Sequence, residues 1–209
     1  MLTIVDYGVG NVGSIKNMIK HVGGDAIVAR APEDLEHATQ IVLPGVGNFG
    51  HAMDLLNDGG WSAALTSCAL QKRIPTLGIC LGMQLMTRGS EESPGVEGLS
   101  WIEADTVRFD DARDRRLKIP HMGWNVVTPR QNSLLLDQSG QESRFYFVHS
   151  YHVRCDRDED IAGTTIHGRL FTSCIQRRNL FGFQPHPEKS HKFGMSVFRK
   201  FVEIGKKRC

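Results

Sequence analysis

The sequence predicts an α/β protein built on an open, mostly parallel sheet with helices on both faces, and with an antiparallel β insertion in the second half. Three observations predict this fold. Up to about residue 90, short apolar runs alternate with helical patterns, which is typical of βαβ units. Over 96–153 that rhythm is lost, and short β-like runs such as 145–148 replace it. The end of the chain returns to strands followed by an amphipathic helix.

The individual elements follow in order along the chain. Apolar runs predict buried strands at 2–5, 26–29, 41–43 and 74–79. Helices are expected at 14–22, 32–37, 52–56, 61–69 and 81–87. A charged stretch at 110–116 belongs to the predicted strands and loops of the insertion. Two strands at 170–175 and 180–184 precede a last helix near 191–204, for which Ser190 is the expected N-cap.

Composition narrows the class of protein. The 209 residues are enough to bury a proper core and fit one domain over 1–209. A net charge of +2 does not favour a nucleic-acid or membrane partner. The five cysteines are odd in number and none is paired at C-x-x-C spacing, so neither a disulfide framework nor a metal site is expected. With no basic segment before the apolar residues 1–5, the simplest compartment is a reducing cytoplasm.

A cysteine stands in a setting typical of nucleophiles. The segment 78–82 reads Gly-Ile-Cys-Leu-Gly and joins an apolar strand to an amphipathic helix. This pattern resembles a nucleophile elbow with Cys80 at its tip, because the glycines permit a sharp turn. The N–H groups and dipole of the following helix favour a thiolate, and the N–H of Leu81 would face a developing oxyanion. The alternative is a small buried cysteine without a chemical role.

A thiolate nucleophile needs a base, and the base needs an orienting group. Among nine histidines, His186 stands out because it follows a predicted strand and begins the segment His-Pro-Glu. The proline keeps His186 extended, and residues i and i+2 of an extended chain face the same side. His186 and Glu188 therefore form a candidate base and orienting carboxylate. Alone this tripeptide would often be a turn, and His149 is the runner-up base.

Two glycine-rich segments each have two interpretations. After the third strand, residues 44–47 read Pro-Gly-Val-Gly and either form an ordinary turn or supply a second oxyanion N–H. After the first strand, residues 8–13 match the dinucleotide fingerprint G-x-G-x-x-G. Arg30, rather than an acid, ends the second strand, which would suggest NADP. A nicotinamide enzyme would leave Cys80 and His186 unexplained, so we favour a turn there.

These motifs together resemble the class I, triad-type glutamine amidotransferases. The resemblance rests on residues 78–84 and 186–190, and it spans essentially the whole chain. More narrowly, the chain is similar to the glutaminase subunits of imidazole glycerol phosphate synthase in histidine biosynthesis. The segments that carry this narrower resemblance are 4–11, 43–47, 120–125 and 145–151. It implies a flavodoxin-like fold with no second catalytic domain.

The resemblance also implies roles for individual residues. Cys80 would attack the glutamine amide to form a glutamyl thioester, with His186 relaying the proton and Glu188 orienting the imidazole. The N–H groups near Val46 and Gly47 and at Leu81 would form the oxyanion hole. The residues implied to bind substrate are Gly45, Gly47, Gln84, His149, Ser150 and Tyr151. Those implied at a partner interface are Asn11, Ser14, Met122, Trp124, Asn125 and Lys189. No cofactor and no metal ion are implied.

The implied partner is a (β/α)₈-barrel cyclase subunit that receives the ammonia in a heterodimer. One departure from the family pattern is Pro185, which stands where an aromatic residue usually precedes His-Pro-Glu. Because proline fixes φ and lacks an N–H, we expect that turn to be set slightly differently. Three other functions remain open from the sequence. They are a paralogous glutaminase for amidino sugars of surface polysaccharides, a cysteine peptidase or esterase, and a catalytically silent partner of a barrel protein.

Overall fold

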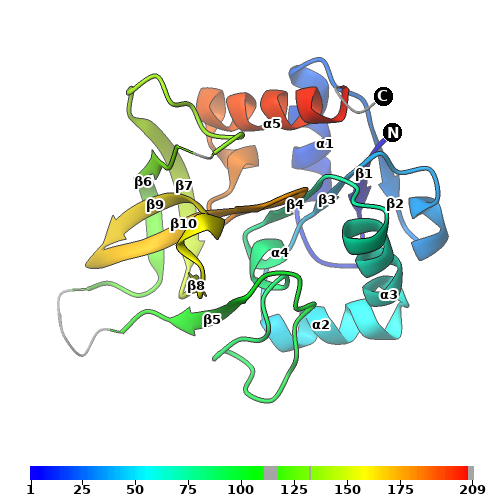
Figure 1. Ribbon diagram of the computed structural model, residues 1–209, viewed down its shortest axis with the longest axis horizontal. Coiled ribbons are helices and arrows are strands. Elements are labelled where there is room, and N and C mark those ends of the chain that lie inside the picture. The colour runs from blue at the N-terminus through cyan, green and yellow to red at the C-terminus, as the bar shows by residue number, and fades with distance from the viewer. Residues whose placement is uncertain (111–116, 132, 207–209) are drawn as a thin grey trace.

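The computed structural model describes residues 1–110, 117–131 and 133–206, so most of the charged stretch at 110–116 lies outside the described residues. Its centre is a mixed sheet flanked by helices (Figure 1). The expected α/β class and mostly parallel sheet are confirmed. In the described part of the chain, no helix combines the length and the apolar character needed to cross a bilayer.

Five four-residue strands form the parallel half of the sheet, in the spatial order β2-β1-β3-β4-β11. Apart from Ile27 and Val28 on the edge strand β2, their apolar side chains are buried because helices cover both faces, as expected for parallel strands. The sequence placed all five, with boundaries within two residues. They are β1 (Leu2–Val5), β2 (Ala26–Ala29), β3 (Gln40–Leu43), β4 (Thr76–Ile79) and β11 (Leu180–Phe183).

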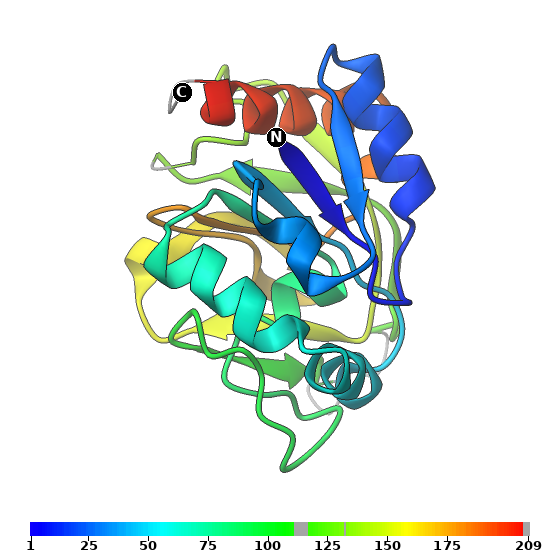
Figure 2. The ribbon, with the colours of Figure 1, turned by 90° about the vertical axis from the view of Figure 1, so that its right-hand side faces the viewer.

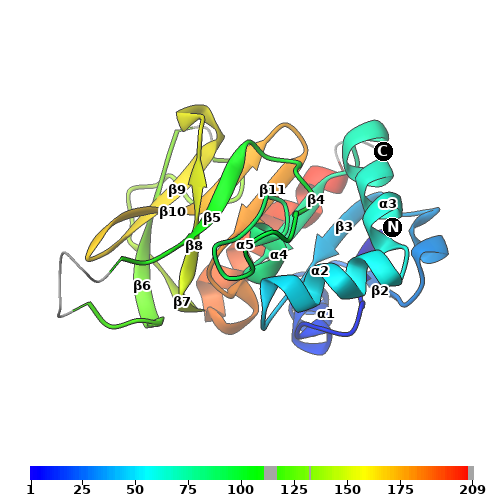
Figure 3. The same cartoon turned by 90° about the horizontal axis from the view of Figure 1, so that it is seen from below.

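The antiparallel half begins at β10, which pairs with β11, and extends the sheet in the order β10-β9-β6-β7. A side pair, β5 with β8, joins it through β10. Figure 3 shows these strands gathered on the left, away from the parallel strands. β9 was not expected from the sequence. The bounds are β5 (Ala104–Arg108), β6 (His121–Pro129), β7 (Ser143–His149), β8 (Tyr151–Cys155), β9 (Ile161–His167) and β10 (Arg169–Arg177).

The helices lie on the two faces of the parallel strands (Figure 2). One face is covered by α1 (Val12–His21) and α5 (His191–Lys206), which bury Ile15, Ile19 and a row of phenylalanines. The other is covered by α2 (Phe49–Asp58) and α3 (Trp61–Thr66). Shorter turns are the 3₁₀ segments Pro32–Leu35, Asp158–Asp160 and Pro187–Lys189 and the π turn Ser67–Gln71.

Two local expectations were wrong in detail. The helix expected over 81–87 is one turn long, α4 (Leu81–Gln84), so its dipole is weaker than a full helix would provide. The hydroxyl of Ser190 does not cap α5. It donates to the carbonyl of His186 at 2.6 Å and accepts from the N–H of Tyr146 at 3.0 Å. The hydroxyl of Ser190 therefore fixes the backbone around His186, whereas its carbonyl oxygen accepts from the N–H of Gly194 at 3.1 Å at the start of the helix.

Candidate active site

Cys80 lies in the tight turn between β4 and α4, at the carboxyl edge of the parallel strands. Its φ of 54° and ψ of −111° are unusual for a residue with a side chain. The flanking glycines make room for this turn. A Cβ on Gly82 would lie 1.9 Å from the carbonyl oxygen of Leu43, and one on Gly78 would lie 2.5 Å from that of Gly82. Backbone strain of this kind is common at active sites, where it fixes the direction of a side chain.

His186 and Glu188 lie together just beyond β11. His186 is extended, with φ −96° and ψ 94°, and its Nδ1 is 2.8 Å from Oε1 of Glu188. Both side chains are 2% exposed. Nε2 of His186 has no hydrogen-bond partner in the described part of the chain and remains available to the thiol. Burial alone would lower the pKa of His186, but Cys80 and Glu188 outweigh it and raise the pKa to about 9.

A charged imidazole beside a cysteine favours a thiolate–imidazolium pair, as in other cysteine enzymes. The backbone supports this arrangement: the N–H of His186 donates to the carbonyl of Tyr146 at 2.8 Å, a bridge between the turn and β7. Pro185 leaves that N–H in place because the proline precedes it. The residues Cys80, His186 and Glu188 thus have the geometry of a nucleophile, a base and an orienting carboxylate.

One cavity of about 480 Å³ opens over Cys80 and His186. Most residues that the sequence indicated for substrate or oxyanion binding line it together, although they come from three separate segments. Gly45 is not among the lining residues, since it packs beneath the turn, where a Cβ would lie 2.9 Å from the N of Gly82. Those that line it are Val46, Gly47, Leu81, Gln84, His149, Ser150 and Tyr151.

Other lining residues were not indicated by sequence reasoning: Glu92, Pro120 and Val148. Glu92 is anchored by the N–H of Phe49, which donates to its Oε2 at 2.8 Å, and it brings a carboxylate to the cavity wall. Lys189, expected only at a partner interface, also lines the cavity. No motif marks Glu92, because it lies in a loop outside the segments 78–84 and 186–190.

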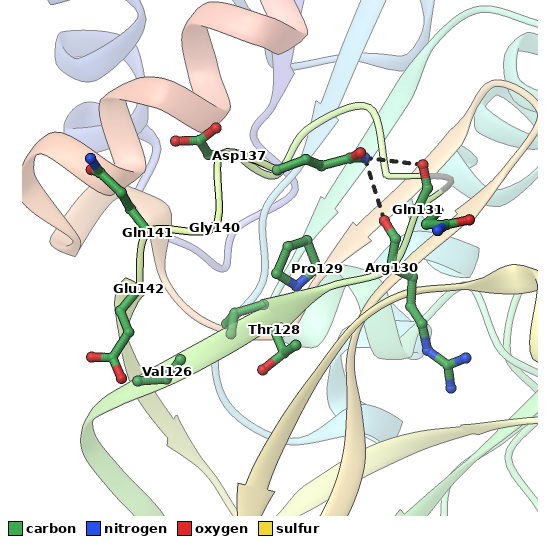
Figure 4. A pocket seen from close by; sticks show the side chains of 11 residues that line it. Val126, Thr128, Pro129, Arg130, Gln131, Asp137, Gly140, Gln141 and Glu142 are labelled. Carbon is green, nitrogen blue, oxygen red and sulfur yellow. Dashed lines mark hydrogen bonds between the residues drawn. The ribbon is translucent and has the colours of Figure 1, made fainter.

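A larger cavity, of about 590 Å³, lies between β6 and the loop 137–142 (Figure 4). Its lining residues include neither a cysteine nor a histidine. The side chain of Gln138 is occupied with the carbonyls of Arg130, Gln131 and Ser133. The cavity over Cys80 is therefore the one with catalytic chemistry.

The geometry decides against His149 as the base. Its Nδ1 lies 2.7 Å from the carbonyl oxygen of Tyr151, and its Nε2 lies 3.0 Å from Nδ1 of His121. Burial holds its pKa well below the ordinary value. With both ring nitrogens bonded, His149 is poorly placed to take a proton from Cys80. Among the described residues, no group of three or more His, Cys, Asp or Glu side chains could hold a metal ion.

The first glycine-rich loop packs against the active site instead of cradling a phosphate. A Cβ on Gly10 would lie 2.9 Å from Cβ of Pro44. The buried hydroxyl of Tyr7 donates to the carbonyl of Pro44 at 3.0 Å. These contacts hold the turn at 44–47 beside Cys80, which accounts for Gly10 without a dinucleotide.

The residues indicated for a partner interface include several exposed apolar side chains. Met122 is 65% exposed and Trp124 is 47% exposed, which is unusual for such large groups on one strand. The indole of Trp124 stacks on His191 at 5.5 Å, with 4° between the rings. Asn11 and Lys189 are exposed, whereas Ser14 and Asn125 are half-buried. We call the exposed side chains Met122 and Trp124 on β6 the docking face; the side chain of the next residue, Asn125, points to the other side of the strand, where it bonds to His121.

Replacing Glu188 by glutamine should slow turnover by about 10²-fold, which is less than the loss of Cys80. The amide keeps the size of the carboxylate, but it no longer stabilises a charged imidazole at 2.8 Å. Steady-state kcat for glutamine hydrolysis measures the effect. A Glu188→Gln rate as low as that of Cys80→Ala would contradict a purely orienting role, and an unchanged rate would remove Glu188 from the triad.

Acid should destabilise the fold between pH 6.5 and 4. Burial lowers the pKa of His121 and of His152 to about 4 and that of His149 well below 6.5. Between these pH values the histidines bind protons in the unfolded chain but not in the folded chain. The free energy of unfolding is therefore highest above pH 6.5 and falls as pH drops towards 4. At pH 5, His121 and His152 each lower the free energy of unfolding by about 2 kcal/mol relative to neutral pH.

Urea unfolding at pH 7 and pH 5 measures this difference. His121→Phe, which keeps a ring in place, should reduce it relative to the unaltered chain. Equal free energies of unfolding at the two pH values would contradict the prediction.

Comparison with known proteins finds relatives over nearly the whole chain. The family model described as "Glutamine amidotransferase class-I" matches residues 3–204. The chain is 47% identical over 205 residues, covering 98% of it and 100% of the relative, to "Imidazole glycerol phosphate synthase subunit HisH 2" of Pseudomonas aeruginosa. It is 47% identical over 203 residues, covering 97% of it and 99% of the relative, to the protein of that name from Methanococcus maripaludis.

Among solved structures, one titled "Crystal structure of glutamine amidotransferase" covers 98% of both chains with a TM-score of 0.76 at 16% identity. "Structure of PurLQS from Thermotoga maritima" covers 97% of both, with a TM-score of 0.74 at 15% identity. At such identity these two support the fold alone. The family match and the full-length relatives support more: the chain belongs to the class-I glutamine amidotransferase family.

Proposed function

We propose that this chain is the glutaminase subunit of an imidazole glycerol phosphate synthase, which supplies ammonia for histidine biosynthesis in the cytoplasm. The observation that carries the proposal is the joining of Cys80, His186 and Glu188 at one cavity, in a chain with 47% identity to two such subunits over nearly its whole length. The proposed domain spans residues 1–209, and glutamine is its substrate.

The first half of the reaction forms a thioester. The Cys80 thiolate attacks the side-chain carbonyl carbon of glutamine, and the carbonyl electron pair moves to oxygen. Backbone N–H groups at Val46, Gly47 and Leu81 are proposed to stabilise that charge. When the intermediate collapses, the C–N bond breaks and the imidazolium of His186 gives its proton to the leaving nitrogen. Ammonia departs and a γ-glutamyl thioester remains on Cys80.

The second half restores the enzyme. Neutral His186 takes a proton from water as the water oxygen attacks the thioester carbon. The C–S bond then breaks, glutamate is released and the thiolate re-forms beside an imidazolium. Glu188 holds Nδ1 of His186 throughout, which keeps Nε2 directed at the reacting atoms. The groups proposed to hold the amino-acid part of glutamine are Gly45, Gly47, Gln84, His149, Ser150 and Tyr151.

The size of the cavity favours a small substrate over a peptide. A cavity of about 480 Å³ holds an amino acid, whereas a peptidase needs an open groove for several residues. The ammonia is proposed to pass to a (β/α)₈-barrel cyclase subunit bound over Asn11, Ser14, Met122, Trp124, Asn125 and Lys189. The exposed apolar side chains Met122 and Trp124 support a partner there.

Glutamate release from glutamine tests the proposal in three mixtures: this chain alone, with the cyclase subunit of the same organism, and with that subunit plus its phosphoribosyl ligand. We expect release that is greatest in the third mixture and absent in Cys80→Ala. Turnover of a peptide or ester instead of glutamine would contradict the proposal. Silence in all three mixtures, with Cys80 still labelled by a glutamine-like electrophile, would retain the triad and reject this partner.

A further inference from the structure

Gln184 contacts the nucleophile although no motif marks it. It follows β11, two residues before His186, and it is fully buried. Its Nε2 donates to Sγ of Cys80 at 3.7 Å, within the range for a sulfur acceptor. A buried amide is costly unless its polar atoms are bonded, so this contact is part of the construction of the site.

The direction of that amide is fixed by a second glutamine. Nε2 of Gln84 donates both to Oε1 of Gln184 at 3.0 Å and to the carbonyl oxygen of Tyr151 at 3.1 Å. Turning the Gln84 amide over would place acceptors face to face, and turning that of Gln184 would place two donors face to face. The network therefore presents an N–H of Gln184, and not its carbonyl, to Cys80. An N–H stabilises a thiolate, whereas a carbonyl oxygen would repel it.

The same carbonyl of Tyr151 accepts a bond from His149, which leads to the surface. Because a carbonyl only accepts, Nδ1 of His149 carries the proton and its Nε2 accepts from Nδ1–H of His121. Nε2 of His121 is left to accept from Nδ2 of Asn125, at 3.0 Å. His121 and His149 face each other in the β6–β7 pair, and burial lowers the pKa of both. They are neutral at pH 7, and each adopts a single tautomer.

These bonds form one continuous chain from Asn125, which adjoins the docking face on β6, to the sulfur. Asn125 is also tied to the backbone on both sides. Its Oδ1 accepts from the N–H of Val126 at 2.8 Å, and its Nδ2 donates to the carbonyl of Ile166 at 2.9 Å. We call this chain the relay; its members are Asn125, His121, His149, the Tyr151 carbonyl, Gln84 and Gln184.

We propose that Gln184 is a positioning residue that holds the Cys80 thiolate, and that the relay from Asn125 holds in place the Tyr151 carbonyl, which sets the direction of the Gln84 and Gln184 amides. The inference rests on the proposed function for the role of Cys80 and for the docking face. A partner that moves Asn125 would act on the nucleophile through bonds already in place. Because the Tyr151 carbonyl accepts from both sides, a change at Asn125 reaches Gln84 by displacing that carbonyl.

The rate at which iodoacetamide alkylates Cys80 tests the relay without glutamine or a partner. The reagent reacts with the thiolate, and mass spectrometry of the peptide containing Cys80 separates it from the other cysteines. The rate is measured from pH 5 to 9. His186 and Tyr7, the titratable groups beside Cys80, are unchanged in every variant.

Gln184→Leu should alkylate about tenfold more slowly at pH 6, since one hydrogen bond to a charged acceptor is lost, and at nearly the normal rate at pH 9. His121→Phe should slow the alkylation of Cys80 at pH 6 about threefold, and so should Asn125→Ala at its half-buried position. His152→Phe is the matched control. That ring packs 4.7 Å from Phe109 in the same cluster but bonds to Arg169 and lies outside the relay. Its alkylation should be unchanged.

Equal rates at pH 6 for the unaltered chain and Gln184→Leu would show that the amide does not hold the sulfur. A His121→Phe profile matching that of His152→Phe, with Asn125→Ala also normal, would show that the relay does not reach Cys80. Slowing by the same factor at every pH would indicate a disturbed fold instead of a thiolate effect, and would also overturn the proposal. None of these outcomes depends on the identity of the partner.

Discussion

Cys80→Ala should abolish glutamate release, with a loss of at least about 10⁴-fold in kcat. Alanine removes the only atom at the tip of the elbow that can form the thioester, while the strained turn and the cavity keep their shape. The measurement is glutamate production with the partner subunit present. Cys155→Ala is the matched control, because that half-buried thiol lies on β8 and does not line the cavity.

Residual release within tenfold of normal in Cys80→Ala would contradict nucleophilic catalysis by this residue. It would favour the alternative of a catalytically silent partner of a barrel protein, in which Cys80 has no chemical role. A loss that also appears in Cys155→Ala would instead indicate general damage to the fold.

His186→Asn should lower kcat by about 10³-fold, whereas His149→Asn should lower it by about tenfold. His186 holds a bond to Glu188, has a raised pKa and has an Nε2 without another partner in the described residues. His149 has both ring nitrogens bonded and a lowered pKa. Thioester formation, followed by rapid acid quenching, separates the two roles.

The reverse result would exchange the two histidines: if His149→Asn stops thioester formation and His186→Asn does not, the base is misassigned.

The dependence of ammonia release on pH gives a second test of His186. Because the pKa of His186 is raised to about 9, its imidazolium persists through neutral pH and declines as pH rises through 9. Release of ammonia should weaken over the same interval.

The parallel half of the fold could be predicted because its strands carry a simple signal. A short apolar run in the sequence corresponds directly to a strand that is buried on both faces in the structure. β9 was missed because Gly163, Thr164 and Thr165 interrupt its apolar pattern, and its position depends on pairing with β10. α4 was expected to be longer because its apolar spacing continues past Gln84, but the chain turns away there.

The site shows a similar division. Cys80 and His186 could be found because glycines and a proline mark the local backbone they need. Gln184 and Glu92 could not, since an amide or a carboxylate in a buried position carries no local pattern. The pairing of His121 with His149 joins residues 28 apart through strand register, which sequence spacing does not reveal.

The most direct test of the central claim is the mass of the Cys80 peptide after the chain, with its cyclase partner and ligand, is mixed with glutamine and quenched in acid. The account predicts a γ-glutamyl group on Cys80, formed in step with ammonia release and absent in His186→Asn. A glutamyl group on another residue, or glutamate release with no covalent intermediate on Cys80 at any quench time, would contradict it.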